Sequence, residues 1–177
     1  GSISKVYMAA AIMVLVDEGR VSLDRPVKDY LAEFKMADDR YKDITVRMLL
    51  NHTSGIPGTQ GANSFGFRYE DDVKRETIKT LNRSHLKHAP GAMTVYCNDG
   101  FTLAEMIVER ITGVRFIDFL NQKVFMRLNL KNTGMGVGEI KGKRIALYYD
   151  ASTGKAHPPE TISVLGAGGL SANAVDV

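Results

Sequence analysis

The segment GSISKVYMAAAIMVLVDEG, residues 1–19, is the part of this sequence that decides the fold class. Its alanine-, methionine- and valine-rich part runs without a break to Gly19, and glycine is a common helix C-cap. Apolar residues fall on nearly every side of the predicted helix over residues 4–18, and a helix that is apolar all round is usually buried. We therefore expect a buried helix here, with other elements packed around it.

Further helices are predicted along the chain, whereas strand patterns are almost absent. Thr45 has the place of an N-cap before the apolar residues 46–50, and Pro26 that of the first residue of a short helix. Residues 59–69 are expected to form a surface loop, and residues 144–149 are β-prone. Apolar periodicity predicts further helices over residues 71–81, 101–111 and 116–128. The pattern predicts an α+β protein with a mainly helical body.

Composition limits the possible functions. The 177 residues are 44% hydrophobic and 24% charged, which is typical of a globular domain. The 23 basic and 20 acidic residues nearly balance and form no block of one sign, so a nucleic-acid partner is not indicated. No apolar run approaches the about 20 residues that span a bilayer. The single cysteine, Cys97, excludes an internal disulfide and a thiolate metal cluster.

Ser2 and Lys5 are the first candidates for catalysis, because Ser2-Ile3-Ser4-Lys5 has the form S-x-x-K at the start of a helix. Positions i and i+3 share a helix face, so the lysine amine can approach the serine hydroxyl. A neutral lysine can take the serine proton and make the oxygen a nucleophile. The pattern also arises by chance, and Gly1-Ser2 could be the remnant of a cleaved tag.

Tyr96 and Asn98 form a second candidate pair, on a predicted loop after Pro90-Gly91. A tyrosine there can relay a proton between nucleophile and leaving group, and an asparagine can hold a substrate amide. The alternative is a packed tyrosine followed by an asparagine that caps the next helix. His85 and His88, three residues apart, could ligate a metal, but a solvated helix end is the more common explanation.

Five segments, taken together and in this order, resemble the serine β-lactamase-related family of the penicillin-binding protein superfamily. That family includes class C β-lactamases, D-alanyl-D-alanine carboxypeptidases, D-aminopeptidases and related esterases. The resemblance covers nearly the whole chain, and the Y-x-N form of the second motif, in place of S-D-N, points to the class C and carboxypeptidase branch. A glycine before the nucleophile is usual in the family, which argues against a tag remnant. The segments are GSISKV (1–6), LLNHTSGIP (49–57), PG leading to YCNDG (90–100), ITG (111–113) and GAGGLS (166–171).

The resemblance implies a serine hydrolase that works through an acyl-enzyme on a β-lactam, a D-amino-acid peptide or an ester. Ser2 would be the acylated nucleophile, and Lys5 its base. Tyr96 would share the proton transfer, while Asn98 would hold the substrate amide. The Ser2 N–H would be one oxyanion donor, and His52 a structural loop residue. No metal or organic cofactor is implied, and the implied location is periplasmic, secreted or at the cell surface.

The family's third motif, K-[ST]-G or H-x-G on a strand near the C-terminus, has no counterpart in this sequence. Residues 131–134 (KNTG) and 152–155 (STGK) come too early, and Asn132 interrupts the first of them. We therefore expect residues 1–177 to be an incomplete domain of the β-lactamase/transpeptidase-like fold. It would be the helical lobe without most of the antiparallel sheet, inactive alone, with an exposed face that favours self-association.

Two other hypotheses stay open. The chain could be a non-catalytic module of the same fold that binds β-lactams or cell-wall peptides as a sensor. It could also be a helical interaction domain with accidental motifs. The joint presence of Ser2, Lys5, Tyr96 and Asn98 favours catalysis, because a binding scaffold has no need of all four. Cys97 stands where the family usually has serine, so we expect a changed detail there and not a lost mechanism.

Overall fold

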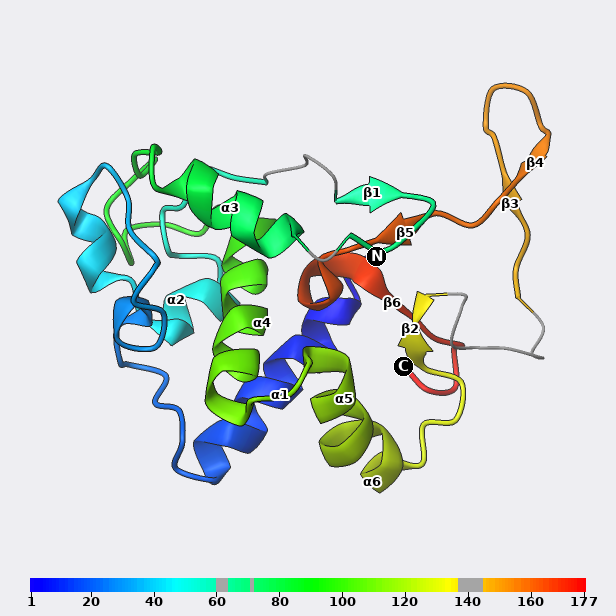
Figure 1. Cartoon of the computed structure of the whole chain (residues 1–177), viewed down its shortest axis with the longest axis horizontal. Helices are drawn as coiled ribbons and strands as arrows, with labels where there is room; N and C mark the ends of the chain where they lie inside the picture. The colour runs from blue at the N-terminus through cyan, green and yellow to red at the C-terminus, as the bar shows by residue number, and fades with distance from the viewer. Residues whose placement is uncertain (60–63, 71, 137–144) are drawn as a thin grey trace.

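The structure is a computed structural model, and it describes residues 1–59, 64–70, 72–136 and 145–177. Two long helices, α1 (Ser4–Asp17) and α4 (Asn98–Thr112), lie side by side in the middle of the molecule (Figure 1). The single π-helical turn η4 (Leu165–Gly169) packs against both helices. Buried apolar side chains from these elements and their neighbours form one hydrophobic core.

The other helical elements are short and surround this pair. Each strand in the described ranges has two residues, and the strands pair antiparallel as β1–β5, β2–β6 and β3–β4 (Figure 1). The mainly helical α+β fold that the sequence predicted is therefore confirmed. The helical elements are η1 (Val27–Asp29), η2 (Asp39–Asp43), α2 (Val46–Leu50), α3 (Val73–Leu81), α5 (Phe116–Leu120), η3 (Asn121–Phe125) and α6 (Met126–Leu128). The strands are β1 (Phe65–Gly66), β2 (Gly134–Met135), β3 (Tyr148–Tyr149), β4 (Ala156–His157), β5 (Thr161–Ile162) and β6 (Leu170–Ser171).

Helix α1 is buried on one side only, which corrects the expectation of a helix covered all round. Met8, Ile12 and Leu15 on its inner side are fully buried. Val6 and Met13 are 68% and 42% exposed, because no described residue covers the opposite side of the helix. An apolar pattern on every face thus marked the helix correctly but could not say how many of its sides are covered.

Helix boundaries differ from the predicted ones where capping or packing intervenes. Thr45 caps α2 as expected, since its Oγ1 accepts the Met48 N–H at 3.4 Å. Pro26 precedes η1 and is not its first residue, because its ψ of 139° is extended. Helix α4 begins at Asn98, three residues before the predicted start. The predicted helix over 116–128 is divided into α5, the wider π-type turn η3, and α6.

Two expectations about the remaining chain are modified. The predicted loop over residues 59–69 contains strand β1. Parts of three predicted segments lie outside the described ranges: residues 60–63 of this loop, residue 71 of the helix predicted over 71–81, and residue 144 of the β-prone segment 144–149. Strand β3 falls within the rest of that segment and forms a hairpin with β4. Among the described helices, none has both the length and the apolar character that crossing a membrane requires.

Gly169 ends the η4 turn at a point where no side chain fits. A Cβ there would lie 2.3 Å from the Ile162 carbonyl oxygen and 2.8 Å from Leu165 Cδ2. We expect Gly169→Ala to lower the free energy of unfolding by about 2–3 kcal/mol, since overpacking moves backbone as well as side chains. The check is thermal unfolding followed by circular dichroism, with an expected drop in Tm of about 5–10 °C.

The matched control is Gly66→Ala in β1, the strand that pairs with β5. A Cβ at Gly66 would meet only the Arg68 carbonyl oxygen, at 3.9 Å, which is ordinary van der Waals contact. This variant should unfold within about 2 °C of the wild type, because surface substitutions of this kind change stability by less than about 0.5 kcal/mol. Equal Tm values for the two variants would contradict the proposed packing of η4.

Candidate active site

Ser2 lies in the turn that leads into α1, and Lys5 lies in the first turn of the helix. The Lys5 N–H donates to the Ser2 carbonyl oxygen at 3.0 Å, so the two residues are one turn apart on the same side. Lys5 Nζ donates to Ser2 Oγ at 3.2 Å. Ser2 is exposed, whereas Lys5 is only 8% exposed. The S-x-x-K spacing therefore places a buried amine next to an accessible hydroxyl.

Tyr96 reaches the same hydroxyl from the segment before α4. Its phenol oxygen and Ser2 Oγ share a hydrogen bond of 2.5 Å. The His52 ring lies against the Tyr96 ring with centroids 4.6 Å apart, and Lys5 Nζ lies 4.9 Å from the Tyr96 centroid. Tyr96 is 53% exposed, so it is not the packed tyrosine of the alternative hypothesis. Ser2 Oγ thus has two proton-exchanging groups within hydrogen-bond distance.

Lys5 Nζ has three oxygen partners within hydrogen-bond distance. Besides Ser2 Oγ they are Asn98 Oδ1 at 2.7 Å and the Ala167 carbonyl oxygen at 2.5 Å. Asn98 Nδ2 donates to Thr59 Oγ1 at 2.9 Å. Its side chain therefore joins Lys5 to the segment before β1. The alternative hypothesis, in which Asn98 caps the next helix, is not what the structure shows, since Asn98 is the first residue of α4. The structure brings all four candidate residues into one connected hydrogen-bond network.

The environment of this network changes the pKa values of two rings. Burial raises the pKa of Tyr96, but the hydrogen bonds with Lys5 and Ser2 and the charge of Lys5 together lower it by more. The pKa of Tyr96 therefore lies below its ordinary value. Burial and the charge of Lys5 lower the pKa of His52. The Cys97 N–H donates to His52 Nδ1 at 3.1 Å, which requires an acceptor nitrogen there. His52 therefore supports Tyr96 as a neutral ring, and the expected structural role fits its contacts.

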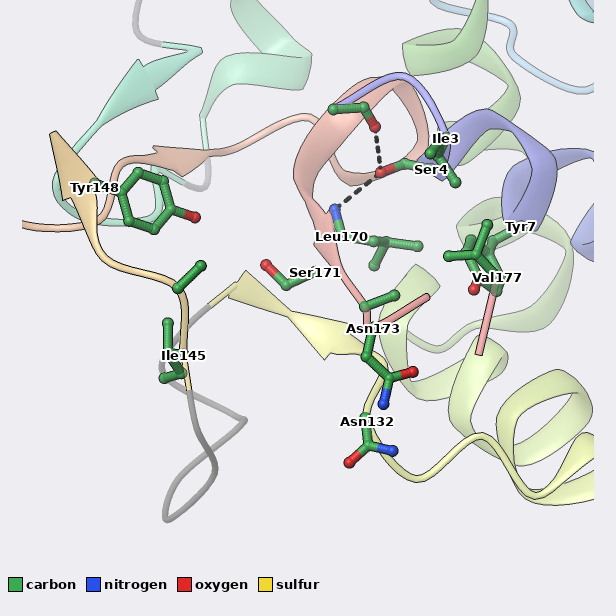
Figure 2. A pocket seen from close by; sticks show the side chains of 13 residues that line it. Ile3, Ser4, Tyr7, Asn132, Ile145, Tyr148, Leu170, Ser171, Asn173 and Val177 are labelled. Carbon is green, nitrogen blue, oxygen red and sulfur yellow. Dashed lines mark hydrogen bonds between the residues drawn. The ribbon is translucent and has the colours of Figure 1, made fainter. Parts of the chain in front are cut away.

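Three partners of the network were not predicted from the sequence: the Ala167 carbonyl, Thr59 and Ser4. Ser4 Oγ donates to the Gly1 carbonyl oxygen at 2.9 Å and accepts the Leu170 N–H at 3.0 Å, which ties the Ser2 turn to β6 (Figure 2). A cavity of about 560 Å³ opens beside this bridge (Figure 2). The only available signal was the GAGGLS segment, which the resemblance had singled out without assigning it a contact.

A smaller cavity of about 180 Å³ lies at Ser2 itself. Ser2 and Asn98 contribute to its wall together with the apolar side chains of Phe65, Ile162 and Val164. A reacting group bound there would meet the hydroxyl, the asparagine amide and an apolar surface. The arrangement is suited to holding a carbonyl compound next to a nucleophile.

The sequence contains two further S-x-x-K patterns, at residues 84–87 and 152–155, and neither has such surroundings. Ser84 Oγ donates to the Thr80 carbonyl oxygen at 2.9 Å, which is a local bond within and just after α3. Ser152 Oγ donates to Asp150 Oδ1 at 2.6 Å in the exposed β3–β4 hairpin. Only the pattern at residues 2–5 combines a lysine, a tyrosine and an asparagine from separate elements among the described residues.

Comparison with known proteins agrees with this geometry. The family model described as Beta-lactamase matches residues 1–177, the whole chain. The chain belongs to the beta-lactamase family. Penicillin-binding protein 4 of Amycolatopsis lactamdurans is 30% identical to this family member over 163 residues, which are 92% of this chain and 42% of the relative. This chain therefore spans less than half the length of that relative.

Solved structures give the same result for the fold of this beta-lactamase family chain. A D-stereospecific amidohydrolase from Streptomyces sp. superposes with a TM-score of 0.79 at 25% identity, covering 99% of this chain and 57% of the other. A class C beta-lactamase superposes with a TM-score of 0.82 at 21% identity, covering 99% and 47%. The β-lactamase/transpeptidase-like fold that the resemblance implied is confirmed.

The two segments that resemble the family's third motif have other partners in the part of the chain that the structure describes. Asp176 binds the first of them, since its Oδ2 accepts the Asn132 N–H at 2.6 Å and the Thr133 hydroxyl at 3.2 Å. The second, residues 152–155, forms the turn between β3 and β4. The rejection of both segments as the third motif stays a prediction.

Cys97 and His88 each have a backbone carbonyl oxygen beside the side chain. Cys97 is buried, its Sγ contacts the Gly58 carbonyl oxygen at 3.4 Å, and burial raises the pKa of the thiol to about 11. The thiol is therefore protonated near neutral pH. His88 Nδ1 lies 2.8 Å from the Ala89 carbonyl oxygen. Within the described ranges, no three His, Cys, Asp or Glu side chains come together to hold a metal ion.

Proposed function

We propose that the protein is a serine hydrolase that forms an acyl-enzyme on Ser2 with a β-lactam, a D-amino-acid peptide or an ester. One observation carries the proposal: Ser2 Oγ lies within hydrogen-bond distance of both Lys5 Nζ and the Tyr96 phenol. A nucleophile, a base and a second proton carrier in mutual contact are what acyl transfer requires. Membership of the beta-lactamase family supports the same chemistry.

The proposed reaction begins when Ser2 Oγ attacks the substrate's carbonyl carbon, and the carbonyl π electrons move onto oxygen. The hydroxyl proton passes to Lys5 Nζ, directly or through Tyr96. When the tetrahedral intermediate collapses, the bond to the leaving nitrogen or oxygen breaks, and that atom takes a proton through Tyr96. Water then attacks the acyl-enzyme, a proton returns to Ser2 Oγ, and a carboxylic acid is released.

The contacts of Lys5 and Asn98 support these roles. The route requires Lys5 to be a neutral amine at the moment of attack, and Asn98 Oδ1 and the Ala167 carbonyl hold it on the nucleophile before and after proton transfer. The lowered pKa of Tyr96 makes its phenol a better proton carrier near neutral pH. Asn98 would exchange its bond to Thr59 for one to the substrate amide.

We propose further that residues 1–177 alone are an incomplete and inactive domain. The Ser2 N–H would be one donor of the oxyanion hole, and no described residue has been assigned as the second. The relatives are longer, since this chain spans 42% of the Amycolatopsis protein and 57% of the Streptomyces amidohydrolase. The uncovered apolar side of α1, with Val6 and Met13, would favour self-association of the 177-residue chain.

The test is intact-protein mass spectrometry of the full-length protein after exposure to a penicillin and, separately, to a fluorophosphonate. We expect one adduct per chain with each reagent, and peptide mapping should place it on Ser2. A penicillin adduct that persists for hours indicates slow deacylation, as in a carboxypeptidase that the drug traps. An adduct that decays within the mixing time indicates a β-lactamase. A folded protein that forms neither adduct would favour the non-catalytic binding module.

A further inference from the structure

We propose that Glu105 is a positioning residue for Lys5. It binds the η4 turn at Gly166, and it holds that turn so that the Ala167 carbonyl stays on Lys5 Nζ. The inference rests on the proposed function, because it concerns the base of that same site. Glu105 does not contact Ser2 or the cavity beside it, and the reaction steps above do not use it.

Glu105 is a carboxylate in the interior of the protein, with 0% exposure. One oxygen, Oε2, accepts the Gly166 N–H at 2.8 Å, and the other, Oε1, accepts from Lys74 Nζ at 3.0 Å. Burial raises the pKa of Glu105, whereas the charge of Lys74 and the Gly166 N–H favour its ionised form. This carboxylate binds a backbone N–H directly beside the residue whose carbonyl accepts from Lys5 Nζ, so it is placed to fix the position of that carbonyl.

The link from Glu105 to Lys5 is one residue long. Gly166 gives its N–H to Glu105, and the next residue, Ala167, gives its carbonyl oxygen to Lys5 Nζ at 2.5 Å. The turn has little freedom, because a Cβ on Gly166 would lie 2.8 Å from Met8 Sδ and 3.2 Å from the Phe101 carbonyl oxygen. A shift of Gly166 away from α4 would therefore move the Ala167 carbonyl relative to Lys5.

Lys74 joins Glu105 to a second carboxylate that serves a different segment. Lys74 Nζ donates to Glu109 Oε2 at 2.7 Å, and Glu109 Oε1 accepts the Phe116 N–H at 3.0 Å, at the start of α5. Burial lowers the pKa of Lys74, but Glu105 and Glu109 raise it more, so the amine is charged. Glu105 and Glu109 thus share one cation and each bind one backbone N–H, but only Glu105 binds η4.

This pair of carboxylates provides a matched experiment on the full-length protein. The rate of Ser2 acylation by a fluorophosphonate and the Tm are measured for Glu105→Gln and Glu109→Gln. In Glu105→Gln one acceptor oxygen remains for two donors, so the amide NH2 must face either the Gly166 N–H or the Lys74 amine. Because Lys74 is charged it takes the oxygen, Gly166 loses its acceptor, and the turn is displaced. We expect acylation to slow by about 10- to 100-fold, since small misplacements of catalytic groups have effects of this size. Glu109→Gln should lower Tm but change the acylation rate by less than about 3-fold. The weakened hydrogen bond is the one to the Phe116 N–H at the start of α5, and its loss leaves the catalytic geometry in place.

A rescue variant separates positioning from a general loss of stability. In Lys74→Met/Glu105→Gln the competing cation is gone, and the glutamine oxygen is available to Gly166 alone. We expect its acylation rate to return to within about 5-fold of the wild type, whatever its Tm, because the Ala167 carbonyl is again held in place. Equal slowing in Glu105→Gln and Glu109→Gln, or no recovery in the double variant, would overturn the inference alone. Absence of labelling in the wild type would overturn the proposed function as well.

Discussion

Ser2→Ala in the full-length protein is expected to abolish covalent labelling by penicillin and by fluorophosphonate. The variant lacks the only oxygen that contacts both Lys5 Nζ and the Tyr96 phenol among the described residues. In a serine protease, substitution of the nucleophile alone lowers kcat on the order of 10⁶-fold. The adduct mass should therefore vanish, and hydrolysis of any substrate found should fall to background.

The control for this prediction is Ser152→Ala. Ser152 belongs to an S-x-x-K pattern of the same form, but it lies in the exposed β3–β4 hairpin, where its hydroxyl binds Asp150. Labelling of this variant should equal that of the wild type. Both variants should unfold at similar temperatures, because both serines are exposed. An adduct that survives in Ser2→Ala and disappears in Ser152→Ala would refute the assignment of Ser2.

Lys5→Arg is expected to slow acylation of Ser2 by about 10²- to 10⁴-fold, the usual contribution of a general base. Arginine keeps the positive charge and can donate to Asn98 and the Ala167 carbonyl, but its guanidinium does not lose a proton in proteins. The substitution therefore separates the proton-accepting role of Lys5 from its charge. The measurement is the acylation rate by stopped mixing and mass spectrometry, with Tm as a check on folding.

The comparison that completes this test is Tyr96→Phe. The hydrogen bonds of Lys5 and Ser2 to Tyr96 lower its pKa against the effect of burial, so the phenol is the other candidate acceptor of the Ser2 proton. If Lys5→Arg acylates at a rate close to the wild type while Tyr96→Phe does not, Tyr96 is the base and Lys5 supplies only charge. If the larger arginine prevents folding, Lys5→Met serves in its place, and retention of acylation in that variant would contradict a role for Lys5.

Local patterns predicted the elements that carry the site, but not their ends. The helix over residues 101–111 was expected from its apolar period, and the helix in fact begins at Asn98. Residues 98–100 carry no apolar repeat, so nothing in them distinguished a helix turn from a loop. The boundary matters for the candidate site, since Asn98 lies in the first turn of α4, which packs against α1.

Contacts between distant segments could not be predicted from local patterns. Ala167 lies 162 residues from Lys5, and its carbonyl is a group that every residue possesses. Glu105 stands between apolar residues in a helix, where a charged residue usually faces solvent, and yet it is fully buried because Lys74 and Gly166 meet it there. The prediction for the outer side of α1 was wrong in the opposite direction, since Val6 is apolar and was expected to be buried but is exposed.

By itself the sequence determined the family, through the order of its motifs, and with it the fold and the candidate residues at positions 2, 5, 96 and 98. The local spacing alone did not single out residues 2–5, because S-x-x-K occurs three times in the sequence, and the choice rested on the order of the motifs. Only the tertiary structure showed which of the three patterns brings a tyrosine and an asparagine into hydrogen-bond contact with its serine and lysine. A side chain becomes a candidate nucleophile through the groups around it, and the tyrosine, the asparagine and the Ala167 carbonyl reach Ser2 and Lys5 only when α4 and η4 pack against α1.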